Sequence, residues 1–503
     1  MASPETASSN VFEIEEASVA ALQAAMSSGE LRATRLVDYY LMRIEQLDDR
    51  LKAMISLNPR AREIATALDQ ERASGQQRST LHGIPLVIKD NIDTAELPTT
   101  GGAKALAKLQ PPDDAFAVAQ LRAAGAIILG KTNLHELAYS GETLSSLGGQ
   151  TRNPYNLDYT PGGSSGGSAV AIAANFATVG LGTDTINSVR SPASACNIVG
   201  LRPTAGLVSR DGIIPVALSQ DTIGPMGRTV ADVATVLEVI AVDDPADPMT
   251  ARSTRRRKGS YQPFLKKSGL SGKRLGIVRS LFGQTVQHQP VNGLMDTAFS
   301  AMEGLGAHCL EISVKIDIDQ LLDELSVLQW EGKLHLNKYL ETLGAAAPVK
   351  SLKALLKSGQ VHSSIQPLLK KLQAVDSPLG SGEYWQRCYP RRAELRQVLT
   401  RIFRSYHLDA LVYPHQRKSM ALIGETQQER NGFLAAASGF PAITIPAGFA
   451  PQNLPVGIEF MAMPFQEAQL LQMAYAYEQK TNWRRLPQLA IPSKAPKPVK
   501  LSR

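Results

Sequence analysis

The sequence predicts an α/β fold with one large mixed sheet flanked by helices. Strand and helix patterns alternate early in the chain, with a strand at 83–90, a helix at 115–124 and a strand at 126–130. Such alternation is typical of helices that cover a mostly parallel or mixed sheet. Strand patterns return after a mostly helical stretch at 317–404, which favours one continuous α/β unit over two. We therefore expect a single sheet of about ten strands, a size known among α/β enzymes.

Each element is predicted from its hydrophobic spacing. Val19, Leu22 and Ala25 recur at helical intervals, whereas the apolar run at 83–90 is typical of a strand buried on both faces. The expected helices cover 13–26, 32–47, 60–73, 115–124, 134–139, 168–177, 229–241, 291–305 and 466–481, and the expected strands cover 53–57, 83–90, 126–130, 178–182, 273–278, 309–314, 408–413, 442–447 and 456–461.

The domain organisation is predicted from the stretches in which the alternation of strands and helices is interrupted. We expect one domain over 8–490, with 317–404 as a helical cap or insertion and 491–503 as a basic flexible tail. The stretch 243–272 is rich in proline, serine and basic residues, and we expect it to be a surface connection.

Composition and charge narrow the classes of function. Of the 503 residues 43% are hydrophobic and 20% charged, which is an ordinary globular balance. The net charge of +7 comes partly from basic blocks at 255–258 and 266–273 and from the tail. These blocks lack interleaved aromatic residues, so a solvated linker or tail is favoured over nucleic-acid binding.

The cysteines and the apolar runs predict a cytoplasmic protein. Cys196, Cys309 and Cys388 are too few and too scattered for a disulfide framework, and the histidines lack metal-ligand spacing. The longest apolar run, 169–181, is too short to span a bilayer, and the N-terminus shows no signal-peptide pattern. We expect no cofactor, no metal and no membrane contact, and a homodimer is compatible with the sequence.

Two clusters of glycine and serine, at 162–168 and 182–191, flank the apolar run 169–181. Glycine permits positive φ and close approach to the backbone, so such clusters suggest loops gathered around a small ligand. Lys89 closes the apolar strand at 83–90. A serine hydroxyl needs a base to become a nucleophile, and burial favours the neutral lysine that could act as that base.

Six ordered segments resemble the amidase signature family. They read GIPLVIKDNIDT at 83–94, GKTNLHELA at 130–138, TPGGSSGGSA at 160–169, GTDTINSVRSPA at 182–193, GLRPTAGLVSRDGI at 200–213 and DTIGPMGRTVAD at 221–232. The segment around Tyr139 to Arg152, with GGQTRNPY, is similar to stand-alone amidases, including those that act on peptide C-terminal amides or aryl-acetamides. The resemblance implies the amidase signature fold and a Ser-Ser-Lys triad, with Ser188 as nucleophile, Ser164 as the bridging serine on a cis peptide and Lys89 as base.

The resemblance also implies an oxyanion hole, formed by backbone N–H groups at Thr185, Ile186, Asn187 and Ser188. The sequence departs from the family here, because two glycines usually stand where Ile186 and Asn187 are found. A β-branched residue does not readily adopt positive φ, so we expect negative φ at Ile186.

The remaining site residues are also implied by the resemblance. Ser165 braces the bridging serine, Asp184 pairs with Arg190 to hold the turn, and Ala138, Tyr139 and Ser140 line the acyl pocket. Residues of the helical insertion between Asp317 and Tyr389, Trp330 and Trp385 among them, are candidates for the opposite wall, and the sequence does not choose between them.

Two alternative site types fit the glycine-rich motif less well. Residues 162–166 match the G-x-S-x-G nucleophile elbow, but the preceding segment is polar and proline-rich rather than a strand. A phosphate-binding loop would need a Gly-Lys-Ser/Thr that is absent from this segment.

We therefore expect an amidohydrolase that converts a small linear carboxamide to a carboxylate plus ammonia or an amine through an acyl-enzyme on Ser188. Two alternatives remain open. One is a glutaminase subunit of a tRNA-amidating complex, and the other is a binding protein whose altered oxyanion turn has lost catalysis.

Overall fold

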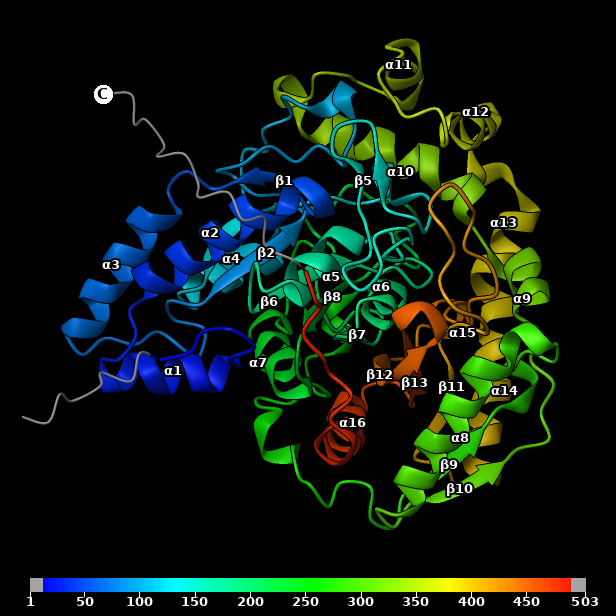
Figure 1. The fold of residues 1–503 in the computed structure, drawn as a ribbon. Coiled ribbons are helices and arrows are strands. Elements are labelled where there is room, and N and C mark those ends of the chain that lie inside the picture. Colours follow the sequence, from blue (N-terminus) through cyan, green and yellow to red (C-terminus); the bar gives the residue numbers. More distant parts are fainter. Residues whose placement is uncertain (1–11, 490–503) are drawn as a thin grey trace, which may run out of the picture.

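A computed structural model describes residues 12–489 (Figure 1). Eleven strands form one mixed sheet in the order β1-β3-β2-β6-β8-β7-β12-β13-β11-β9-β10. The strands are β1 (Met54–Leu57), β2 (Pro85–Lys89), β3 (Ile127–Thr132), β6 (Val179–Thr183), β7 (Val199–Arg202), β8 (Ile223–Gly227), β9 (Arg274–Ile277), β10 (His308–Glu311), β11 (Ala410–Pro414), β12 (Ala442–Ala450) and β13 (Leu454–Met461). A separate two-stranded ribbon joins β4 (Leu144–Ser145) to β5 (Gly149–Gln150).

Helices flank the sheet along its whole length. In Figure 1, α1 to α3 lie at the β1 end, and α8, α9 and α14 lie at the β10 end. The helices are α1 (Val19–Ser28), α2 (Ala33–Leu51), α3 (Ala61–Ala73), α4 (Phe116–Ala123), α5 (Gly166–Ala173), α6 (Arg190–Ala195), α7 (Val230–Ile240), α8 (Gln289–Glu303), α9 (Ile318–Leu325), α10 (Leu328–Thr342), α11 (Leu352–Lys357), α12 (Gln366–Ala374), α13 (Gly382–Gln386), α14 (Arg392–Ser405), α15 (Phe433–Ser438) and α16 (Glu467–Thr481). No helix within residues 12–489 is long and apolar enough to cross a membrane.

Strand direction brings the ends of two central strands together. β2 is parallel to both β3 and β6, and Ile88 pairs with Leu181 in the register between β2 and β6. The carboxyl ends of parallel strands lie at the same edge of a sheet, so Lys89 and Thr183 end side by side. Antiparallel pairs of β6 with β8 and of β12 with β13 make the sheet mixed.

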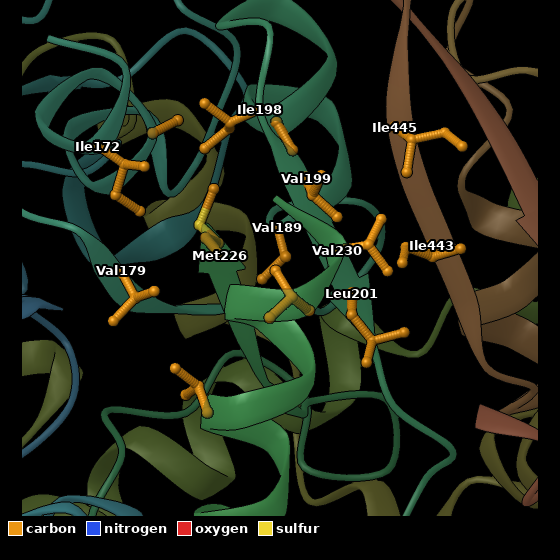
Figure 2. Packing of buried hydrophobic residues seen from close by; sticks show 14 of the residues in the cluster. Ile172, Val179, Val189, Ile198, Val199, Leu201, Met226, Val230, Ile443 and Ile445 are labelled. Carbon is orange, nitrogen blue, oxygen red and sulfur yellow. The ribbon is translucent and has the colours of Figure 1, made fainter. Parts of the chain in front are cut away.

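The core fills the space between the central strands and α5, α6 and α7. Val189, the residue after Ser188, is fully buried there. Figure 2 shows it among other buried side chains, including Met226 of β8, Leu201 of β7 and Val230 of α7. The turn before Val189 is therefore anchored to the packed interior.

The α/β class with one mixed sheet and flanking helices is confirmed, but several elements differ from prediction. The sheet has eleven strands, and β7, β8, α6 and α15 were not predicted. The predicted helix at 134–139 is a single 3-10 turn, Glu136–Ala138, in which Leu137 has a φ of 53°. The first helix begins at Val19 rather than residue 13, because the Ser18 side chain caps it by accepting from Ala21 N–H at 3.2 Å.

The predicted surface connection at 243–272 is partly wrong. Asp244, Asp247, Tyr261 and Leu270 within it are buried. The predicted insertion at 317–404 contains α9 to α14 and no strand of the sheet. The domain limits at 8 and 490 stay predictions, and residues 8–11 and the predicted tail at 491–503 lie outside the described residues.

Candidate active site

Lys89 is fully buried at the carboxyl end of β2. Its Nζ lies 2.7 Å from Ser164 Oγ, 2.8 Å from Thr183 Oγ1 and 3.4 Å from the Thr183 carbonyl oxygen. Burial lowers the pKa of Lys89 to about 7, although the charges of Asp184 and Asp221 act in the opposite direction. A substantial fraction of the amine is therefore neutral near pH 7.

The neutral amine has two N–H bonds and one lone pair. The two Thr183 oxygens can accept the N–H bonds, which leaves the lone pair for the Ser164 hydroxyl. Asn91 donates to Thr183 Oγ1 at 3.1 Å and so holds that hydroxyl in place. Thr183 was not among the predicted site residues, although it closes the strand next to Lys89.

Ser164 follows a cis peptide bond between Gly163 and Ser164, as the resemblance implied. Its side chain is fully buried. A Cβ at position 163 would lie 2.8 Å from both the Gly141 carbonyl carbon and Thr143 Oγ1, so only glycine fits without displacing its neighbours. Thr143 also donates to the Gly162 carbonyl at 2.7 Å, which fixes this loop against its neighbour.

Ser188 lies in the turn between β6 and α6. The N–H of Ser165 donates to the Ser188 carbonyl at 3.1 Å, so the two glycine-rich loops are joined beside Ser164. Ser165 Oγ also donates to the Thr183 carbonyl at 3.2 Å. Ser188 is 7% exposed and lines a cavity, whereas Ser164 and Lys89 are fully buried and do not line it. The structure thus brings the three predicted triad residues to one edge of the sheet.

The turn 185–188 has its carbonyl groups engaged and its N–H groups free. Within residues 12–489, none of the four N–H groups donates to a protein acceptor. Ile186 does not have positive φ, as expected for a β-branched residue, and neither does Asn187. The carbonyls accept from Gln220 Nε2 at Thr185 (3.2 Å), Arg190 at Ile186 (2.7 Å), Ser191 N–H at Asn187 (2.7 Å) and Ser165 N–H at Ser188 (3.1 Å). The turn can therefore offer N–H donors to an oxyanion.

A buried charge network holds this turn. Arg190 contacts Asp184 at 3.1 Å and Glu459 of β13 at 2.5 Å, and Arg202 contacts Asp184 at 2.8 Å. Burial alone would raise the pKa of Asp184, but the two guanidinium groups hold that pKa well below its usual range. His415 contacts Glu459 at 2.5 Å and extends the network. Asp184 and Arg190 are thus a buried pair rather than two exposed charges, and Arg202 and Glu459 were not predicted.

A cavity of about 140 Å³ opens beside Ser188. The predicted pocket residues Ala138, Tyr139 and Ser140 line it, with Ala138 at a φ of 62°. Tyr139 also packs in a second apolar cluster, so it belongs both to the core and to the cavity wall. The cavity is lined by Ala138, Tyr139, Ser140, Thr185, Ile186, Asn187, Ser188, Val216, Leu328 and Arg430.

The helical insertion contributes to the cavity wall, but not through either tryptophan. Leu328, the first residue of α10, lines the cavity, and neither tryptophan does. Trp330 packs in a separate small cluster with Ala217, and Trp385 is 39% exposed. The sequence could not choose among the residues of the insertion, because the position of each side chain in the tertiary fold decides which one reaches the cavity.

Arg430 is a site residue that the sequence did not single out. Its guanidinium makes no hydrogen bond or ion pair with another residue of 12–489. Burial lowers the pKa of Arg430, and the charge of Glu142 opposes that shift. Its only sequence signal is its place in a polar loop between β11 and α15, where loops at a sheet edge often carry function.

The chain resembles known proteins over almost its whole length. The family model described as Amidase matches residues 35–471. The peptide amidase of Stenotrophomonas maltophilia is 41% identical, with a TM-score of 0.86, and the match covers 94% of this chain and 98% of that one. A probable amidase of Arabidopsis thaliana is 34% identical over 499 residues, which are 95% of this chain and 93% of that protein. A glutamyl-tRNA(Gln) amidotransferase subunit from Synechococcus sp. (strain CC9311) is 32% identical over 470 residues, 91% of this chain and 96% of that protein.

Proposed function

Because the chain belongs to the Amidase family and is a hydrolase of linear amides, we propose that Ser188 is its nucleophile, Ser164 its proton relay and Lys89 its general base. The observation that carries this proposal is the contact of 2.7 Å between Lys89 Nζ and Ser164 Oγ, made by an amine whose pKa burial lowers to about 7. A lysine in this state can take a proton near neutral pH.

Acylation begins when Ser188 Oγ attacks the carbonyl carbon of the amide. The Ser188 proton passes to Ser164 Oγ, and the Ser164 proton passes to Lys89 Nζ. The free N–H groups of the turn 185–188 stabilise the oxyanion of the tetrahedral intermediate. The C–N bond then breaks, and the proton on Lys89 returns through Ser164 to the leaving nitrogen, which departs as ammonia or an amine.

Deacylation repeats the same proton path with water as the nucleophile. Water gives a proton through the relay to Lys89 as it attacks the acyl carbon. The ester bond to Ser188 breaks, and the proton returns to Ser188 Oγ. The products are a carboxylic acid, which ionises at neutral pH, and the regenerated enzyme.

We propose that the substrate is a peptide with a C-terminal carboxamide. The similarity to a peptide amidase at 41% identity supports this class. The cavity is small and partly apolar, with Val216, Leu328 and Tyr139 in its wall, so it suits one residue of a peptide. The unengaged guanidinium of Arg430 supplies donors for a backbone carbonyl oxygen of that peptide.

A panel of amide substrates tests the proposal by mass spectrometry. Dipeptide amides should take up water and release ammonia, so that the free dipeptide acids appear, and Ser188→Ala should abolish this conversion. Turnover of none of the amides by a folded enzyme would contradict the proposed substrate class.

The second candidate is the glutaminase subunit of a tRNA-amidating complex. The 32% identity to an amidotransferase subunit favours it, but the 41% identity to a peptide amidase is higher. Glutamine belongs in the same panel for this reason. Glutamine hydrolysis that requires a co-purified partner chain, without peptide amide turnover, would favour this candidate.

The third candidate, a binding protein without catalysis, is tested by covalent labelling. A fluorophosphonate should modify the native protein at Ser188, because the turn keeps its free N–H groups with Ile186 and Asn187 in place. Labelling that appears only after Ile186→Gly and Asn187→Gly would support loss of catalysis in the native protein.

The cellular location and assembly are also proposals. Three free cysteines, of which Cys196 is buried, suit a reducing cytoplasm. A homodimer is tested by light scattering after size exclusion, where twice the chain mass of 54.2 kDa is the expected result.

A further inference from the structure

Four arginines from two distant segments line one cavity away from the active site. Arg252 and Arg256 come from the connection after α7, and Arg392 and Arg396 come from the first turns of α14. The cavity has a volume of about 470 Å³, and no aspartate or glutamate lines it. We call it the arginine cavity. It shares no lining residue with the cavity beside Ser188.

The arginines of this cavity differ from their neighbours in sequence. Arg257 forms an ion pair with Asp243 at 2.8 Å, and Arg391 forms one with Glu383 at 3.0 Å. Within residues 12–489, none of the four cavity arginines lies within 4.0 Å of a carboxylate oxygen. The charges that face the cavity are thus the ones left without an ion-pair partner.

The positive charges of the cavity arginines repel one another, and burial of these groups is unfavourable. Burial lowers the pKa of Arg396, and the charge of Arg252 lowers that pKa further. Burial likewise lowers the pKa of Arg392. An anion in the cavity would offset both the repulsion and the desolvation of these groups.

Two of the guanidinium groups are held in place before any ligand arrives. Arg392 is buried and donates to Ser219 Oγ at 3.2 Å and to the side-chain oxygen of Gln220. Arg256 lies over the ring of Phe465, 5.1 Å from its centroid. Such preorganisation reduces the entropy lost when a ligand binds.

The guanidinium groups of the cavity favour a phosphate-bearing ligand. Several guanidinium forks together suit phosphate groups, which accept paired hydrogen bonds and carry more than one charge. The volume lies in the range of small-molecule sites, and Phe465 and Met249 add an apolar wall. We propose that the arginine cavity is a binding site for a small phosphate-bearing anion of about nucleotide size.

Calorimetric titration of the full chain with ATP and with inorganic triphosphate tests the site, at about 150 mM salt, where exposed charges more than about 8 Å apart are largely screened. Adenosine serves as the uncharged probe. We expect ATP or triphosphate to bind and adenosine not to bind. The double variant Arg252→Gln/Arg396→Gln should weaken that binding at least about tenfold, since it removes charge-assisted hydrogen bonds to the phosphate groups.

The matched control is Arg401→Gln/Arg404→Gln, which removes the same charge from two α14 positions that are exposed like Arg252 and Arg396 but do not line the arginine cavity. It should bind both phosphate probes as the native chain does, and both double variants should keep the native melting temperature. Absence of phosphate binding, or equal weakening in both double variants, would overturn the proposal. Tighter binding of a single-stranded oligonucleotide that depends on all four substituted arginines would assign the surface to nucleic acid instead.

Discussion

Lys89 determines the pH range of the proposed reaction. As a base it must be neutral, and the neutral fraction rises as the pH passes upward through a pKa of about 7. We predict that kcat/KM rises from acid pH to a plateau, with an apparent pKa near 7, measured on a dipeptide amide. A profile that is flat between pH 5 and 9 would exclude a titrating lysine base.

Ser188→Ala removes the proposed nucleophile without removing a large side chain. We expect kcat to fall by at least about 10³-fold with an unchanged melting temperature. Ser191→Ala is the matched control, because Ser191 lies in the same region and its buried hydroxyl has no partner within residues 12–489. If the two variants lose activity equally, the assignment of Ser188 is wrong.

Arg430 is predicted to act on binding rather than on chemistry. We expect Arg430→Gln to raise KM for a dipeptide amide about tenfold, because one charge-assisted hydrogen bond to the substrate is lost, with kcat nearly unchanged. Gly141→Ala should act in the same direction, since a Cβ there would lie 1.9 Å from an Arg430 terminal nitrogen and would displace that guanidinium. A fall in kcat with constant KM would contradict this role.

Among elements, the link between α6 and β13 supports the active-site turn. Glu459→Gln removes a charge that pairs with Arg190 at 2.5 Å inside the fold. Breaking a buried pair leaves the remaining charge poorly compensated, so we expect a loss of about 3 kcal/mol in the free energy of unfolding, measured in urea. Glu425→Gln, an exposed position, is the control and should change stability by less than about 0.5 kcal/mol.

Elements differ in how far the sequence could predict them. β2 and α7 have long, regular hydrophobic patterns, and the structure places them within two residues of the prediction. β8 reads Ile-Gly-Pro-Met-Gly, and α6 is six residues with a proline, so neither carries a recognisable period. Their conformations depend on pairing and packing with distant segments.

The active-site residues also divide into those that the sequence could predict and those that depend on the tertiary fold. Lys89, Ser164 and Ser188 lie in segments that resemble the amidase signature family, and that resemblance predicted that they act together. Arg430 and Leu328 reach the cavity through the tertiary fold, and nothing next to them in the sequence marks that position.

At the scale of the whole molecule, the active site is supported by strands that come late in the sequence. β12 and β13 lie in the middle of the sheet, although they are among its last elements in sequence. We predict that a chain ending at residue 441 is not labelled by a fluorophosphonate, although it contains Lys89, Ser164 and Ser188. A chain ending at residue 490 is the control and should be labelled. Labelling of the shorter chain at the rate of the control would contradict this dependence.

The contact between Arg190 and Glu459 also bears on biosynthesis. Ribosomes add residues from the amino end, so every reactive group of the proposed triad is polymerised more than 250 residues before Glu459. A nascent polypeptide therefore carries the reactive groups while more than 250 further residues are added, without the acid that holds their turn. Cleavage of cellular amides by unfinished chains would be withheld until Glu459 has been added.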